Sequence, residues 1–195
     1  MIQPSTVTSP RIVSLQRDLE TGHTQALDDF WQDLLVQGTP LIEAIPEDET
    51  QVLVTFLWKD SGDTQQVMVF NGPDFWINPT DNQLLRLLHT NLWYKTYKAR
   101  ADMRNLYFFS HNGPLDFSTE DWSKRVLETF RPDQFNPYQF EQVYSGSILE
   151  LPAALPQPWI IPRPEIPKGR VEERQFTSTL LGNERRVWVY TPPGY

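Results

Sequence analysis

The sequence predicts a mainly β fold, an antiparallel β-sandwich preceded by a helix. Short segments rich in β-branched and aromatic residues recur with turn residues between them, as is typical of such sandwiches. One segment with a helical period comes before them. A segment that contains six prolines within 18 residues follows them. At 195 residues, the chain is long enough for one domain and part of another.

The helical period follows His23 and ends before a Gly-Thr-Pro sequence. Its apolar positions form one stripe, which consists of Leu27, Phe30, Trp31, Leu34 and Leu35. Thr24 is expected as the N-cap, and Gly38 and Pro40 are expected to end the helix. The residues before it begin with a polar segment containing two prolines, so a loose tail is expected over residues 1–20.

The strands are predicted from period-two patterns and aromatic content. Val52, Val54, Phe56 and Trp58 lie on one face of the first strand. A short helix is predicted over Asp121–Phe130, whereas residues 80–91 fit either a helical turn or an irregular crossing. The predicted strands are 51–59, 65–71, 92–100, 105–111 and 147–152. Together they define a sandwich domain over residues 21–150.

The segment 151–168 is rich in proline and is predicted to be an extended, semi-rigid connector. Residues 169–195 then form a predicted hairpin. Val171–Leu180 pairs with Glu184–Thr191, and the turn between them contains Gly182 and Asn183.

Composition excludes several functional classes. The net charge of −8 and pI near 4.9 argue against nucleic-acid binding. The absence of cysteine excludes disulfides and thiolate metal sites. No apolar run is long enough for a membrane helix, and no signal peptide is visible, so a cytoplasmic protein without membrane contact is expected.

Catalytic motifs are not found in the sequence. The run Ser145-Gly146-Ser147 does not match the G-x-S-x-G nucleophile elbow. His23, His89 and His111 are far apart and lack metal-ligand spacing, and no nucleotide-binding glycine pattern occurs. The sequence therefore predicts no catalytic residue, no metal site and no cofactor.

One stretch, "WYKTYKARADMRNLYFF", combines cations with aromatic rings against an acidic background. Such a combination can hold a flat anionic ligand by charge attraction and ring contact. The candidate binding residues are Trp93, Tyr94, Lys95, Tyr97, Lys98, Arg100 and Arg104. The alternative is a surface strand with solvated cations and rings that pack inward. Trp58, Phe75 and Trp76 form a second aromatic group, for which either core packing or ligand stacking is possible.

Several segments occur in an order that resembles the N-terminal domain of enterochelin (enterobactin) esterases, over about residues 38–195. They are "GTPLIE", "VTFLWK", "LHTNLWYKTYKARADMRNLYFF", "RPDQFNPYQF", "SILELPAALPQPW" and "GNERRVWVYTPPGY". The resemblance implies an immunoglobulin-like, early-set sandwich followed by an α/β-hydrolase domain. That second domain carries the serine, histidine and acid that hydrolyse ferric enterochelin and release iron. The hairpin over residues 169–195 resembles its opening, and no catalytic residue of the family falls within this chain.

The resemblance therefore implies an accessory domain that covers the substrate site of an α/β-hydrolase partner, and a ferric catecholate siderophore as ligand. Two alternatives stay open. One is an early-set carbohydrate-binding module that uses Trp58 or Trp76. The other is an inert fragment of a split esterase gene, with an unpaired strand edge at risk of aggregation.

Overall fold

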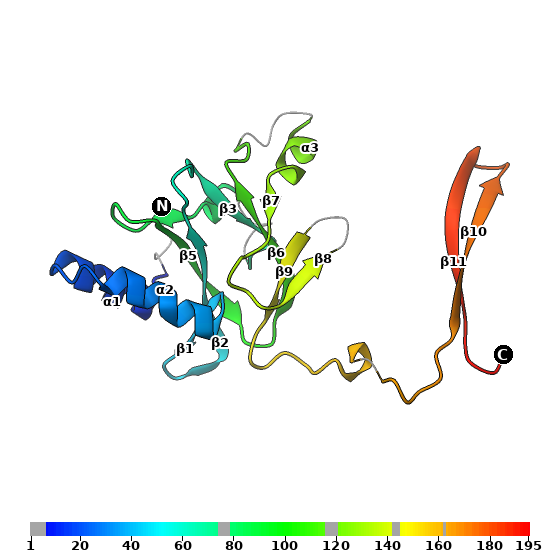
Figure 1. Ribbon diagram of the computed structural model, residues 1–195, viewed down its shortest axis with the longest axis horizontal. Coiled ribbons are helices and arrows are strands. Elements are labelled where there is room, and N and C mark those ends of the chain that lie inside the picture. The colour runs from blue at the N-terminus through cyan, green and yellow to red at the C-terminus, as the bar shows by residue number, and fades with distance from the viewer. Residues whose placement is uncertain (1–6, 74–78, 116–120, 142–144, 162) are drawn as a thin grey trace. The chain divides into compact units, whose positions relative to one another are not determined.

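The computed structural model describes residues 7–73, 79–115, 121–141, 145–161 and 163–195 (Figure 1). The chain divides into two compact units, Met1–Leu155 and Pro156–Tyr195. The first unit continues beyond the expected boundary at residue 150 because Leu151 is buried in its core. Each unit is described separately.

The first unit contains two antiparallel sheets, which confirms the predicted β-sandwich. One sheet has the order β1-β2-β5-β4, and its strands are β1 (Leu41–Ile45), β2 (Asp48–Lys59), β4 (Leu85–Arg86) and β5 (Leu92–Arg100). The other has the order β3-β6-β9-β8, with β7 paired to β6. Its strands are β3 (Val67–Phe70), β6 (Arg104–His111), β7 (Phe130–Arg131), β8 (Gln139–Glu141) and β9 (Ser145–Glu150).

The main core lies between the two sheets. Val52, Val54 and Phe56 of β2 face Tyr107 and Phe109 of β6 in this core, because alternate residues of a strand point to the same face. The Phe56 and Tyr107 rings meet edge to face at 4.8 Å between centroids. The predicted inward face of β2 is therefore confirmed.

Two helices, α1 (Pro10–Glu20) and α2 (Ala26–Gln37), cover the outer face of the first sheet (Figure 1). The predicted stripe of α2 is confirmed at Phe30, Trp31 and Leu34, which are buried, whereas Leu35 is exposed. The predicted Thr24 cap is wrong: the helix begins one residue later, after Gln25, which makes no side-chain cap.

The expectation of a loose tail over residues 1–20 is wrong for Pro10–Glu20, which form α1. Pro10 occupies the first turn of the helix, where its missing N–H costs no hydrogen bond. Ser9 caps the helix by accepting a hydrogen bond from the Ile12 N–H at 3.1 Å. Ile12 and Leu15 then bury their side chains against α2 and the sheet.

Replacing Ser9 by alanine is expected to lower the free energy of unfolding by about 1 kcal/mol. The Ser9 hydroxyl accepts from the Ile12 N–H and donates to the Glu43 carboxylate on β1. Alanine would therefore leave the Ile12 N–H without its acceptor and Glu43 without this donor. Chemical denaturation of the Ser9→Ala and Ser9→Thr proteins measures the effect. Threonine keeps the hydroxyl and should retain most of the stability; an equal loss in both would contradict the capping role.

The outer face of the second sheet packs against the short helix α3 (Trp122–Leu127), which lies within the predicted helix over Asp121–Phe130. Val126 of α3 is buried with Met68, Phe70 and Phe108 in a third apolar cluster. Residues 80–91, for which two structures were possible, contain a 3₁₀ turn, η1 (Pro79–Asn82), and the short strand β4.

The second unit contains the connector from Pro156 onward and the predicted hairpin, whose strands are β10 (Arg170–Ser178) and β11 (Asn183–Thr191). Gly182 has a φ of 59° in the turn, a conformation that glycine adopts without steric cost. The connector, which was expected to be extended throughout, contains one 3₁₀ turn, η2 (Pro158–Ile160), because Pro158 fits the first position of such a turn.

Candidate functional site

Three of the predicted binding cations are paired with carboxylates. The Lys98 Nζ lies 3.3 Å from an Asp48 oxygen, and Arg100 forms a 2.7 Å ion pair with Asp102. These acids lie on β2 and in the β5–β6 turn.

Arg104 is the third paired cation. It contacts Glu150 on β9 at 2.7 Å and also donates to the Leu155 carbonyl at 3.0 Å. The hydrogen bond and charge of Arg104 hold the pKa of the Glu150 carboxyl below its usual value. These pairings neutralise the cations at this end of β5 and β6.

The aromatic members of the predicted set lie on both faces of β5. Trp93 and Tyr97 point into the core between the sheets and are buried. Tyr94 points to the opposite face, where it packs against the α1–α2 cluster and where burial raises the pKa of its phenol. The structure therefore does not bring all seven residues to one surface.

A smaller group does converge at the edge of the first sheet. Arg86 on β4 is the direct partner of Trp93 on β5, so their side chains share a face, and Lys95 and Tyr97 continue this face along β5. The Arg86 guanidinium carbon lies 6.0 Å from the Trp93 ring centroid. The Lys95 Nζ lies 5.7 Å from the centroid of Tyr97. We call these four residues the β4–β5 edge.

Neither cation of the β4–β5 edge forms a close ion pair within the described residues. No carboxylate there lies within 4.0 Å of Arg86 or Lys95, although Arg86 Nε donates to the Thr90 carbonyl at 2.6 Å. The pKa of the Asp60 carboxyl is lowered, against the effect of its burial, by hydrogen bonds from Gly62 and Thr64 and by the charge of Arg86, so Arg86 already interacts with one carboxylate at longer range.

The Trp93 Nε1–H is buried and has no hydrogen-bond partner among the residues that the structure describes. The two cations suit a ligand that carries negative oxygen atoms, whereas the Trp93 and Tyr97 rings are buried and support the cations from below.

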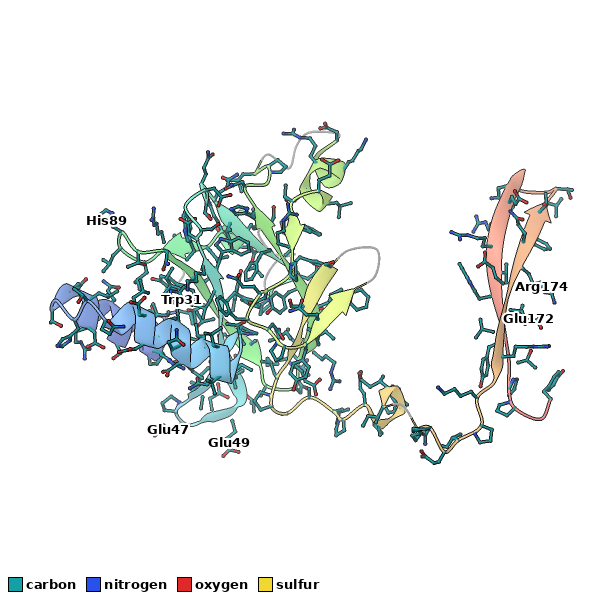
Figure 2. The ribbon with its side chains drawn as sticks, viewed as in Figure 1. Trp31, Glu47, Glu49, His89, Glu172 and Arg174 are labelled. Atoms are coloured by element: carbon teal, nitrogen blue, oxygen red, sulfur yellow. The ribbon has the colours of Figure 1, made fainter. Side chains whose placement is uncertain are left out.

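The β4–β5 turn places Arg86 at this position. The Leu87 N–H donates to the Leu92 carbonyl at 2.8 Å, and the Thr90 hydroxyl donates to the Leu87 carbonyl at 2.7 Å. Leu88 adopts a positive φ of 49°, and His89 lies in the same turn (Figure 2). The sequence analysis did not select Arg86, because the leucines on both sides of it interrupt the apolar–polar alternation that indicates a hairpin. The Thr90-Asn91 pair was the signal from which the turn could have been predicted.

Of the second aromatic group, only Trp58 lies in the described residues, and it does not present an exposed ring for stacking. Trp58 is half-buried; its ring stacks on His111 at 4.9 Å, and its Nε1–H donates to the Thr64 hydroxyl at 3.2 Å. Phe75 and Trp76 lie outside the described residues.

Comparisons with known proteins agree on one group of relatives. A family model described as "Enterochelin esterase, N-terminal" matches residues 53–160. The chain is 29% identical to an iron(III) enterobactin esterase from Yersinia enterocolitica, over 86% of this chain and 55% of the relative. It is also 29% identical to the Dickeya dadantii iron(III) enterobactin esterase, over 83% of this chain and 42% of the relative.

Solved structures give the same result. The enterobactin esterase of Shigella flexneri, solved in the presence of 2,3-dihydroxy-N-benzoyl-serine, matches with a TM-score of 0.55 and 26% identity, over 82% of this chain and 44% of that one. A structure in the presence of enterobactin matches with a TM-score of 0.55 and 27% identity, with the same coverage. The chain thus spans between 39% and 55% of the length of the curated relatives that it matches. No helix in the described parts of the chain is long and apolar enough to cross a membrane.

Proposed function

This chain belongs to the enterochelin esterase N-terminal family, and on that premise we propose that it is the accessory, substrate-covering domain of an enterochelin-esterase-like protein. In this proposal an α/β-hydrolase half supplies the catalytic triad, and the substrate is the ester of a ferric catecholate siderophore, cleaved in the cytoplasm to release iron. The present chain contributes binding surface and no catalytic residue.

The β4–β5 edge is the observation that carries the substrate proposal. A ferric catecholate is anionic and has flat rings, and the overall charge of −8 repels it. Attraction must therefore come from local cations that are not held in close ion pairs, which are Lys95 and, with Asp60 acting on it at longer range, Arg86. Lys98, Arg100 and Arg104 are committed to ion pairs, so they contribute less to the proposed contact.

The β10–β11 hairpin supports the proposal of a hydrolase half. Residues directly opposite in the register share a face, so Val171, Trp188 and Tyr190 lie on one face and Phe176, Val187 and Val189 on the other. All six side chains are exposed. A two-stranded hairpin with apolar groups on both faces is only marginally stable by itself, so a partner is needed to cover both faces.

Equilibrium dialysis of the chain against the ferric complex of 2,3-dihydroxybenzoylserine tests the substrate proposal. The Arg86→Gln/Lys95→Gln protein is expected to bind about tenfold more weakly than the wild type, which corresponds to the loss of roughly two exposed cation contacts. Glutamine is shorter than arginine or lysine, but it keeps a polar side chain while it removes the charge.

The matched control is Lys98→Gln/Arg100→Gln, which removes the same charge from the ion-paired end of β5. Its affinity should stay within about twofold of the wild type. Equal weakening in both double variants would show only a net-charge effect, and unchanged binding in Arg86→Gln/Lys95→Gln would refute the β4–β5 edge as the contact.

A further inference from the structure

Two Asn-Gly-Pro sequences follow the paired strands β3 and β6. Asn71 comes directly after β3, and Asn112 comes directly after β6. The strands are antiparallel, so the two sequences lie at opposite ends of the same strand pair. Both asparagines have a positive φ, 56° at Asn71 and 54° at Asn112, which asparagine tolerates in tight turns. The two sites therefore share their local sequence and φ, and they differ in the contacts of their side chains.

An asparagine that precedes a glycine can lose its amide nitrogen without an enzyme. The backbone nitrogen of the glycine gives up its proton and forms a bond to Cγ of the asparagine, while the bond from Cγ to Nδ2 breaks. Ammonia leaves with that proton, and a succinimide ring remains. Water then opens the ring at either carbonyl, which gives aspartate or isoaspartate. Glycine favours the attack because it has no Cβ to crowd its nitrogen.

Three hydrogen bonds to the backbone hold the Asn112 carboxamide in one orientation. Its Oδ1 accepts from the Gln65 N–H at 2.8 Å and from the Gln66 N–H at 3.2 Å. Its Nδ2 donates to the Asp63 carbonyl at 2.9 Å. These bonds must break before the carboxamide can turn toward the nitrogen of Gly113 and release its Nδ2, so they add to the barrier of the reaction.

The Asn71 carboxamide makes no hydrogen bond within the described part of the chain, although the Asn71 backbone carbonyl accepts from Asn105 Nδ2 at 2.7 Å. Its side chain is therefore free to turn toward the next backbone nitrogen. We propose that Asn71 is a site of spontaneous deamidation and that it reacts in preference to Asn112. Exposure alone would give the opposite order, because Asn71 is half-buried and Asn112 is exposed.

The reaction changes the chain beside the β4–β5 edge. Gly72 is buried next to Tyr97, whose ring would lie 3.5 Å from a Cβ added to this glycine. Isoaspartate carries the backbone through its side chain and adds a methylene before Gly72, so this glycine must shift against the Tyr97 ring. Either product also adds one negative charge to a chain with a net charge of −8.

Incubation of the chain at mildly alkaline pH, followed by peptide mapping with mass spectrometry, measures the rate at each asparagine. Asn71 is expected to react about tenfold faster than Asn112 or more, because Asn112 must first lose its hydrogen bonds. Gly72→Ala should slow the reaction at Asn71 several-fold, since its Cβ crowds the attacking nitrogen. Alanine fits there, because its Cβ would lie 3.4 Å from Val69 and 3.5 Å from Tyr97, and Gly72 has no positive φ.

The matched control is the same measurement in concentrated urea, where both asparagines lose their folded contacts and the two rates should become similar. A difference that persists in urea would assign its cause to the preceding residues, Phe70 and His111, and would overturn the proposal. Equal rates in the folded chain, or a faster reaction at Asn112, would show that exposure or the N–H donors to Oδ1 control the reaction instead. An unchanged rate in Gly72→Ala would exclude ring closure through Gly72.

Discussion

Replacement of Trp31 by alanine is expected to lower the free energy of unfolding by about 3–5 kcal/mol. Trp31 is only 3% exposed and lies between α2 and the first sheet (Figure 2). Its ring stacks on Phe135 at 5.3 Å, the Lys59 Nζ lies 5.1 Å from its centroid, and its Nε1–H donates to Asn91 at 3.1 Å. Alanine would leave a cavity and remove the donor to Asn91.

Chemical denaturation followed by circular dichroism measures this loss. Val36→Ala is the control on the same helix, and because Val36 is exposed its effect should stay within about 0.5 kcal/mol. A cost below about 1 kcal/mol for Trp31→Ala would mean that α2 does not unfold together with the sandwich, against the contacts that Trp31 makes.

The sandwich was predictable because each core strand buries a regular face. Along β2, the alternation of Val52, Val54 and Phe56 is a direct consequence of packing against the second sheet. The helix α1 was not predictable from the same reasoning. Only Ile12 and Leu15 are buried along it, which is too few to produce a recognisable stripe, and Pro10 was interpreted as a break although it begins the helix.

The candidate site was predictable only in part, because ion pairing depends on contacts between distant segments. Lys98 and Arg104 look like available cations in the sequence, yet their partners Asp48 and Glu150 are brought to them by β2 and β9. Arg86 is the opposite case. No sequence motif singles it out, and it becomes a candidate only because the structure places it opposite Trp93. Aromatic density located β5 correctly but gave no information on which cations are neutralised.

The second large effect concerns Asp133, a carboxylate that is 1% exposed in the segment before β8. Its Oδ2 accepts from the Tyr107 hydroxyl at 2.8 Å, and its Oδ1 accepts from the Phe135 N–H at 3.0 Å. Its own N–H donates to the Ser147 hydroxyl at 2.8 Å. This network holds the segment between β7 and β8 against β6 and β9 of the second sheet.

Asp133→Ala is expected to lower the free energy of unfolding by about 2–4 kcal/mol at pH 5, because it leaves the Tyr107 hydroxyl and the Phe135 N–H without their acceptor. Chemical denaturation measures the difference. Asp133→Asn is the matched variant, because the amide keeps the shape and an acceptor oxygen for Tyr107, and its loss at this pH should be smaller.

The same pair of proteins gives an expected pH dependence. Burial raises the pKa of Asp133, so the folded state favours the protonated carboxyl. The stabilisation from this group is complete below the unfolded pKa of about 3.9 and is lost as the pH rises through the raised folded value. The stability of the wild type relative to Asp133→Asn should therefore fall as the pH is raised from about 4.

Asp102 provides a control of opposite sign. The hydrogen bond from Arg100 lowers the pKa of the Asp102 carboxyl, so stability relative to Asp102→Asn should rise with pH below the unfolded pKa of about 3.9 and stay level above it, where stability relative to Asp133→Asn falls. If both differences rose with pH, the hydrogen bonds from Tyr107 and Phe135 would outweigh the burial of Asp133. The segment before β8 would then hold an ionised carboxylate, and the wild type would lose stability relative to Asp133→Asn as the pH is lowered.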